Sequence, residues 1–416
     1  MTPELELPAH RRLLVDLRPL RRHRDFRLLW VGQSVTFLGS MITYVAIPFQ
    51  VYALTHSSAV VGLLGLVEFV AMISTAFVGG ALADAVDRRR MVRLTEVFLL
   101  LTSAGLLLNA LMPHPSVGAL FVLSAFLTCF DSLQRPSLDA LVPRLVPKDE
   151  LLAAGALNSF RMTLGMIAGP AIGGLLIAGI GLASTYAVDV GTFAVSLVAL
   201  QLMRAVPPPP EAERPSLRGI VEGLRYARSR PELMGTYLVD INAMFFGMPN
   251  ALFPALAVGY GGVGVLGLLY SAPAVGALLA SALSGWTARV HHHGQAVLWA
   301  AGVWGTAILG FGLSSWLWLA LLFLILAGAA DMISGLFRMT IWNTTIPDHL
   351  RGRLAGIELI SYSTGPTLGN VEAGGVAAFT SPRFSAGLGG GLCVIGTLAL
   401  AVALPAFRGY DARETP

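Results

Sequence analysis

Long apolar runs, separated by short polar connections, follow one another along the whole chain. A helix needs about 20 apolar residues to cross the hydrocarbon core of a bilayer, and each run reaches that length. We therefore predict twelve membrane-spanning helices in two sets of six. They are 28–54, 59–83, 91–112, 116–138, 151–177 and 181–203, and then 233–257, 264–288, 296–314, 316–342, 354–379 and 384–407.

The connections differ in charge on alternate sides. Odd connections, at 55–58, 113–115, 179–183, 259–264 and 314–315, hold no Lys or Arg, and Arg383 is the only Lys or Arg expected on that side. Even connections carry Arg88 to Arg93, Arg144 with Lys148, the segment 204–232, Arg289, and Arg351 with Arg353. Basic loops stay in the cytoplasm, so we expect a multi-pass plasma-membrane protein with both termini cytoplasmic.

Three polar segments frame the apolar runs. They are an N-terminal arm at 1–27, a linker at 204–232 and a tail at 408–416. The linker opens with four prolines, Pro207 to Pro210, and then places Leu217, Ile220, Val221 and Leu224 at helical spacing. We expect this stretch to form an amphipathic helix on the inner membrane surface.

The two sets of runs also resemble an internal repeat. Asp131 and Pro147 recur 200 positions later as Asp331 and Pro347, and Gly169-Pro170 is echoed by Gly365-Pro366. Two related halves are typical of secondary transporters, in which the substrate site lies at the midplane between them.

Composition agrees with a membrane protein. Of 416 residues, 55% are hydrophobic and only 12% are charged, too few to keep such a chain soluble. The net charge of +4 fits anionic headgroups, and no aromatic-basic pattern points to nucleic acid. No phosphate-binding Gly-x-x-x-x-Gly-Lys-Ser/Thr loop is present, so we expect no use of ATP.

A charged turn between the second and third runs carries a specific motif. Gly80 and Asp84 share one helix face, and Arg88 and Arg89 follow. This turn resembles the loop between the second and third helices of the major facilitator superfamily, although Ala85 and Asp87 depart from that pattern. The resemblance implies that Gly80, Asp84, Arg88 and Arg89 belong to a cytoplasmic gate.

The fifth run presents a face of small residues with a proline among them. Gly165, Gly169, Gly173 and Gly174 surround Pro170, which indicates close helix packing and a kink. The pattern resembles a motif of the exporter branches of the superfamily, although glycine faces are common in membrane helices. Further passages resemble the branch of enterobactin exporters and macrolide-type efflux proteins: Leu108 to Pro113, Leu141 to Pro147, the proline linker and Phe253 to Ala257.

Ionisable side chains inside the runs point to chemistry, because each is costly in hydrocarbon without a partner or a wet cavity. The acids are Glu68, Asp131, Asp189, Asp240, Asp331 and Glu372, and the bases are Arg135, Arg161 and Arg338. Unpaired carboxyl groups at depth are expected to take up protons, with Glu68, Asp131 and Asp240 as candidates for coupling. A neutral, structural hydrogen-bonding role remains open for each acid.

Depth along the helices separates two roles. Glu68 and Arg161 both fall near the midplane, where they either pair directly or face a cavity in which Arg161 holds an anionic or catechol-like group. Asp131 and Arg135 stand four residues apart nearer the cytoplasm, and we expect a structural ion pair or a gate there.

Polar and aromatic residues complete the predicted substrate cavity. Gln33, Phe37 and Tyr44 share a face of the first run, and Asn242, Phe246 and Asn250 share one of the seventh. With Asn158 and Arg161 they suit a cavity for amphipathic molecules, although helix packing explains the aromatic residues equally well.

No cofactor is expected. Cys129 and Cys393 lie in apolar runs and are interpreted as packing residues, and His291 to His293 lack an enclosing ligand set for a metal. We therefore predict a proton-coupled exporter of amphipathic siderophores or drugs, not an enzyme, acting as a monomer in the bilayer. A transport-inactive scaffold or sensor, or an importer of a small solute, remains the alternative.

Overall fold

The computed structural model describes residues 16–85, 88–204, 226 and 228–413, with the backbone alone at 76–85 and 348–362. Every regular element in these ranges is helical, and ten of the described helices are long and apolar enough to cross a membrane. The predicted amphipathic helix at 217–224 lies outside the described residues. The described part of the chain therefore has the all-helical membrane architecture that the apolar runs predict.

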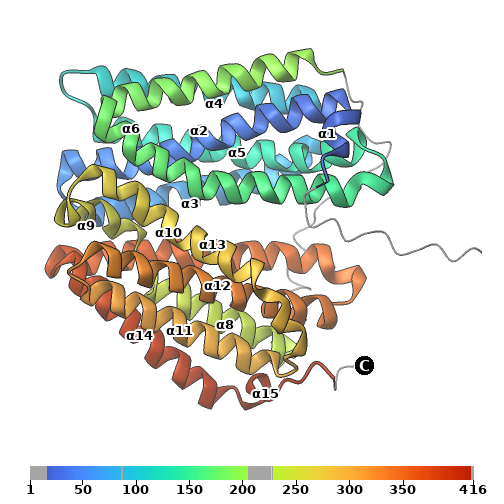
Figure 1. The fold of residues 1–416 in the computed structure, drawn as a ribbon, viewed down its shortest axis with the longest axis vertical. Helices are drawn as coiled ribbons and strands as arrows, with labels where there is room; N and C mark the ends of the chain where they lie inside the picture. Colours follow the sequence, from blue (N-terminus) through green and yellow to red (C-terminus); the bar gives the residue numbers. More distant parts are fainter. Residues whose placement is uncertain (1–15, 86–87, 205–225, 227, 414–416) are drawn as a thin grey trace, which may run out of the picture.

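The helices form two bundles that lie side by side (Figure 1). The N-terminal bundle contains α1 (Arg18–Arg22), α2 (Arg24–Thr55), α3 (Ser58–Ala85), α4 (Arg88–Leu111), α5 (Val117–Leu145) and α6 (Leu151–Leu202). The C-terminal bundle contains α8 (Pro231–Phe246), α9 (Phe253–Tyr260), α10 (Val263–Ala282), α11 (His293–Leu313), α12 (Leu317–Thr345), α13 (Asp348–Phe379), α14 (Pro382–Ala403) and α15 (Pro405–Arg408). Short 3-10 turns at Lys148–Glu150, Asn250–Leu252 and Ser284–Arg289 join some of these helices.

Two predicted spans are continuous in sequence as α6. This 52-residue helix leaves helical geometry at Gly181, whose φ of 81° is left-handed. Glycine adopts that region without a Cβ penalty, so the chain can reverse there with no loop. The runs at 151–177 and 181–203 are the two arms of α6.

The span predicted at 233–257 is present in the structure as Pro231–Tyr260, but it is not one continuous helix. Helix α8 ends at Phe246, and α9 begins only at Phe253. Pro249 has no N–H to donate, and Pro254 sits in the first turn of α9, where a missing N–H costs nothing. The prolines therefore bend this span near its outer end.

The arm predicted at 1–27 is partly helical. Helix α2 starts at Arg24, and the short α1 precedes it. Glu150 holds α1 in place, because its carboxylate accepts from His23 Nε2 at 3.1 Å and from Arg22 Nη1 at 3.4 Å. The polar arm therefore packs against the connection between α5 and α6.

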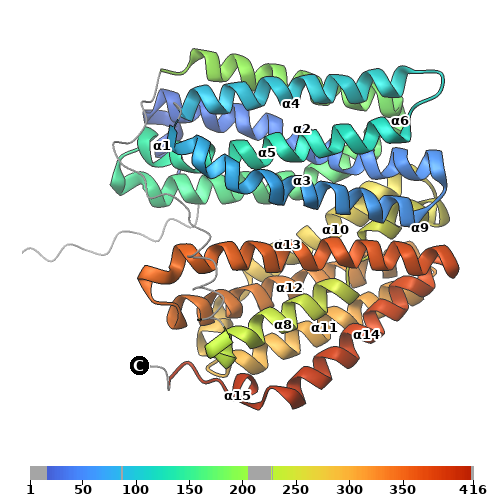
Figure 2. The ribbon, with the colours of Figure 1, turned by 180° about the vertical axis from the view of Figure 1, so that it is seen from behind.

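The two bundles touch through α6 with α10 and through α3 with α13. Ser271 Oγ donates to the carbonyl of Ile167 at 2.7 Å, and Asn250 Nδ2 donates to Tyr44 OH at 3.3 Å. These contacts lie in the half of the helices nearer the α2–α3 connection and α9, whereas the bundles diverge toward the end that holds α1 and the C-terminus (Figure 2). The two bundles are therefore closer together toward one end of the helices than toward the other.

Candidate substrate cavity

A cavity of about 430 Å³ lies inside the N-terminal bundle. Its size falls within the range typical of small-molecule sites. All of its lining residues come from α2 to α6. Among them are Gln33, Phe37, Tyr44, Glu68, Asp131, Arg135, Asn158 and Arg161, which the sequence analysis singled out. We call it the N-terminal cavity.

Arg161 of α6 is held on one wall by neutral partners. Its Nε and Nη2 donate to Asn158 Oδ1 at 3.1 and 2.8 Å, and Nη1 donates to the carbonyl oxygen of Gln33 at 2.9 Å. The guanidinium also lies over the ring of Phe37, 5.5 Å from its centroid. Within the described ranges no carboxylate forms an ion pair with Arg161, so its positive charge is available to a ligand.

Glu68 of α3 contributes a carboxyl group to the same cavity. The hydroxyl of Ser124 on α5 donates to it. No cation pairs with Glu68 in the described part of the chain, and it is not bonded to Arg161. Of the two arrangements left open by the sequence, the structure has the one in which both groups line a cavity without pairing.

Helix α5 adds a row of charges to the cavity wall. Asp131, Arg135 and Asp139 follow at four-residue intervals and all line the cavity, because side chains four apart share a helix face. The ion pair expected between Asp131 and Arg135 does not form among the described side chains. Asp139 was missed by the sequence analysis, which ended the span at 138, although its spacing from Arg135 was a usable signal.

Glu96 of α4 was missed as well, although it lies inside a predicted span. Its side chain is fully buried and accepts hydrogen bonds from Thr36 Oγ1 at 3.1 Å and from Gln134 Nε2. Nearby, Gln33 Nε2 donates to Ser196 Oγ at 3.4 Å. A lone acid in an otherwise apolar run was the signal for it.

Asp189 shows the structural role that the sequence left open for buried acids. It is fully buried, and its carboxyl accepts from Thr43 and from Ser103, each at 2.7 Å. These bonds join α2, α4 and α6. A carboxyl group satisfied in this way stabilises the bundle.

The predicted site residues of the C-terminal bundle do not line this cavity. Asp240 forms an ion pair with Arg338, which also contacts Asp331 at 3.6 Å. Asn242 Nδ2 donates to the carbonyl of Cys393 at 3.0 Å and to Thr397 Oγ1 at 3.2 Å, so it binds α8 to α14. Phe246 packs edge-on against Phe245. Asn250 Nδ2 donates a hydrogen bond across to Tyr44 OH in the other bundle.

The residues of the predicted gate are partly described. At Gly80 and Asp84 only the backbone is described. Arg88 Nη1 donates to the carbonyl of Ala140 at 2.9 Å, and Arg89 donates to the carbonyls of Leu200 and Gln201 at 2.9 and 2.8 Å. The last carbonyls of a helix lack intrahelical donors, so Arg89 caps the end of α6.

The small residues of α6 lie where two helices come close. A Cβ on Gly165, Gly169 or Gly173 would meet Phe37, Met41 or the backbone of Ile42 on α2. One on Gly174 would meet the backbone of Gly267 on α10. Pro170 lies between them, and its carbonyl faces Gly267. This face of α6 therefore packs against both bundles.

Comparison with known proteins finds relatives that span almost all of the chain. Residues 15–415 match the transmembrane secretion effector family. The enterobactin exporter EntS of Shigella boydii serotype 4 (strain Sb227) is 32% identical over 406 residues, which are 97% of each chain. EntS of Citrobacter koseri is 32% identical over 390 residues, covering 93% of this chain and 94% of that protein.

Solved transporter structures share the fold at low sequence identity. The nucleoside transporter NupG superposes with a TM-score of 0.75 at 12% identity, covering 93% of this chain and all (100%) of the other. A bacterial homologue of the lysosomal transporter Spinster, in an inward-facing and unoccupied conformation, gives 0.70 at 16% identity, covering 96% and 98%.

Proposed function

Because the chain belongs to the transmembrane secretion effector family of the major facilitator superfamily, we propose that it exports a small amphipathic anion of the siderophore class in exchange for protons. The chain is a multi-pass membrane protein and an exporter by family. In our proposal it works as a monomer of twelve spans, with six in residues 28–203 and six in 233–407. Transport proceeds by alternating access of these two halves.

The observation that carries the proposal is the separation of Arg161 from Glu68 within one cavity. A guanidinium with only neutral partners can bind an anionic or catechol-bearing group through charge-assisted hydrogen bonds. A carboxyl group with a single hydroxyl donor can gain and lose a proton without breaking an ion pair. Had the two paired, neither would be free for substrate or proton.

The closer approach of the two bundles toward one end of the helices supports an inward-open state. The positive-inside distribution of Arg and Lys predicts that both termini are cytoplasmic, and the described contacts between the bundles lie in the opposite half of the helices. The N-terminal cavity then faces the cytoplasm and receives the substrate there. Closing the inner ends of the bundles and opening the outer ends would release the substrate outside.

Proton exchange follows from the charges in the cavity. The substrate anion binds Arg161 while Glu68 is ionised or gives up its proton to the cytoplasm. After the substrate leaves on the outside, Glu68 takes up a proton, which neutralises the carboxyl for the return step. One proton enters for each such cycle through Glu68.

The relatives named enterobactin exporters support a catecholate siderophore as the first substrate to test. Aromatic rings line the N-terminal cavity at Trp30, Phe37 and Tyr44, and such rings pack well against catechol rings. Asp131 and Arg135 face the same space and, in our proposal, guide the substrate past the inner opening together with the motif at Gly80 and Asp84.

A counterflow assay tests this function. Proteoliposomes loaded with an unlabelled catecholate siderophore and diluted into labelled siderophore should accumulate label transiently, because a carrier exchanges one molecule for the other. Vesicles without protein and vesicles with Arg161→Ala are the controls. Binding of the siderophore without counterflow would favour the transport-inactive scaffold or sensor and would contradict the proposal.

A further inference from the structure

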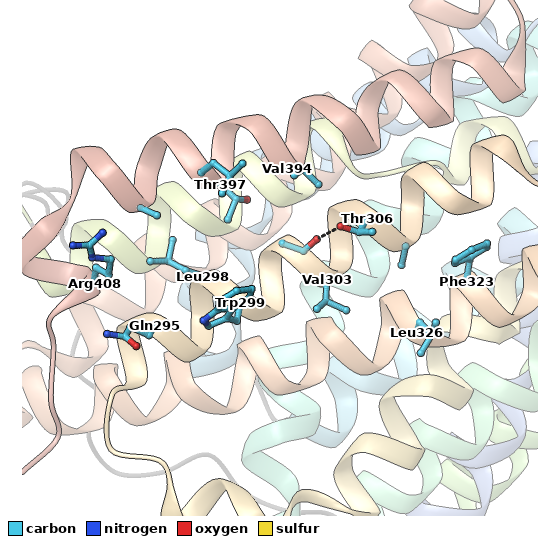
Figure 3. A pocket seen from close by; sticks show the side chains of 14 residues that line it. Gln295, Leu298, Trp299, Val303, Thr306, Phe323, Leu326, Val394, Thr397 and Arg408 are labelled. Carbon is cyan, nitrogen blue, oxygen red and sulfur yellow. Dashed lines mark hydrogen bonds between the residues drawn. The ribbon is translucent and has the colours of Figure 1, made fainter.

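A second cavity, of about 600 Å³, lies at the lateral surface of the C-terminal bundle. It is far larger than a packing defect. It runs between α11, α12 and α14 (Figure 3), and we call it the α11–α14 groove. Its walls are mostly apolar, with Trp299, Val303, Phe323, Leu326 and Leu398 among them. None of its lining residues belongs to the N-terminal bundle.

The groove opens outward, toward the surroundings of the bundle. Trp299 is 75% exposed and Leu398 is 64% exposed. Both residues lie on helices apolar enough to cross a membrane, so this outward face meets lipid acyl chains and not water. A ligand of the groove must therefore be apolar along most of its length.

One end of the groove differs from the rest. Arg408 and Gln295 stand together there, whereas Phe323 and Leu326 lie at the other end (Figure 3). Both polar side chains are exposed, and among the described residues neither has a side-chain partner. Among the described residues no acid lines the groove, and Arg408 is the one charged residue in its lining.

The length of the groove matches one leaflet. From Gln295 to Ala307 along α11 is twelve residues, which is about 18 Å at 1.5 Å per residue. Half of the hydrocarbon core is about 15 Å deep. An acyl chain that fills the groove would therefore start at the polar end and finish near the bilayer centre, and Trp299 near the polar end suits the interface.

We propose that the α11–α14 groove is a binding site for one anionic phospholipid, whose acyl chain lies along Val303 and Leu398 and whose phosphate is held by Arg408 and Gln295. Charge complementarity selects this occupant, because a lone cation beside an apolar groove matches a phosphate at the head of an acyl chain. This site goes beyond the proposed export function, and its test requires no transport.

Native mass spectrometry of the purified, delipidated full-length protein in detergent tests the proposal. Phosphatidylglycerol and phosphatidylcholine with identical acyl chains are titrated in parallel. The wild-type protein should bind one phosphatidylglycerol more tightly than phosphatidylcholine, and Arg408→Gln should lose about fivefold in affinity for phosphatidylglycerol alone. Arg289→Gln is the matched control, since Arg289 is also an exposed arginine at the same end of the helices but does not line the groove.

A second variant tests the acyl-chain part without threatening the fold. Gly302 lines the groove, and a Cβ placed on it meets open space, so Gly302→Leu should fill the groove and remove the tight site for both lipids. Equal affinities of wild type and Arg408→Gln, an equal loss in Arg289→Gln, or unchanged binding by Gly302→Leu would each overturn the proposal. Displacement of phosphatidylglycerol by a catecholate siderophore would assign the groove to the exported molecule instead and would overturn it as well.

Discussion

The carboxyl group of Glu68 accepts one hydrogen bond, from Ser124, and has no cation beside it among the described residues. In Glu68→Gln the amide can still accept that hydrogen bond but cannot exchange a proton. We expect siderophore export driven by a pH gradient to fall about tenfold or more, because the residue that loads the proton is gone. Binding of the siderophore should remain.

The matched control is Glu372→Gln, which removes an acid from α13 that does not line the N-terminal cavity. It should leave export unchanged. Full gradient-driven export by Glu68→Gln would assign coupling to another acid, with Asp131 next, because it also lines the cavity and forms no ion pair with any described residue, and Asp240 after it.

Arg161 is predicted to select anionic substrates. Charge-assisted hydrogen bonds contribute about 1.5–3 kcal/mol each, so Arg161→Ala should weaken binding of an anionic siderophore by about tenfold or more. Binding of cationic drugs should change little. Titration of both ligands against the purified variant by calorimetry gives the comparison, and equal losses for the two would make Arg161 a structural residue that braces Asn158 and Gln33.

At this scale the sequence predicts which residues share a face but not what that face meets. Gln33, Phe37 and Tyr44 line one cavity because helical periodicity alone puts them together. Asn242 obeys the same periodicity, yet it points into α14. The identity of the neighbouring helix is a property of the tertiary fold, which no local pattern contains.

At the scale of helices, the contact between α6 and α10, which we call the α6–α10 seam, depends on Gly174 and Gly267. A Cβ on Gly174 would lie 2.7 Å from the backbone nitrogen of Gly267, closer than packed atoms tolerate. Gly174→Val should therefore part the outer ends of the bundles and shift the protein toward an outward-open state. Spin labels at Ser57 and Phe379, in a variant that lacks Cys129 and Cys393, should report a longer distance.

The control for the seam is Gly191→Val on the second arm of α6, where a Cβ meets open space. Its distance distribution should match that of the wild type. An unchanged distribution in Gly174→Val would show that the seam does not govern the opening of the outer ends.

Element boundaries were predictable where polar residues interrupt apolar runs. The connections after Thr55 and Leu313 fall where the sequence predicts them. The break between α8 and α9 was not predicted, because Gly247, Met248 and Pro249 lie inside one apolar run. Hydropathy reports the polarity of side chains, and it does not reveal where proline prevents the backbone from continuing a helix. Proline and glycine spacing was the better signal there.

At the scale of the whole molecule, orientation can be tested directly. In a variant without Cys129 and Cys393, a cysteine at Ser57 or His114 should react with an impermeant thiol reagent in intact cells, because the connections that hold them carry no Lys or Arg. A cysteine at position 211, in the linker outside the described residues, should react only after permeabilisation. Labelling of position 211 in intact cells would reverse the orientation.

The overall architecture was more predictable from the sequence than the conformational state, inward-open or outward-open, in which the molecule is found. Apolar runs and the motif at Gly80 and Asp84 are enough to indicate a major facilitator fold, because both depend on local sequence. Which end of the bundles is closed depends on contacts between helices far apart in the chain, such as Ser271 with Ile167. Alternating states share one sequence, so the pattern of residues cannot select between them.

The most direct test of proton-coupled export is to follow the proton itself. Proteoliposomes with a trapped pH-sensitive dye and no initial gradient receive siderophore from outside, and in either orientation an exchanger that takes substrate in must let protons out. We expect the lumen to become alkaline as siderophore enters, with no signal in protein-free vesicles and none with Glu68→Gln. Accumulation of siderophore by the wild-type protein at constant lumen pH would contradict proton exchange.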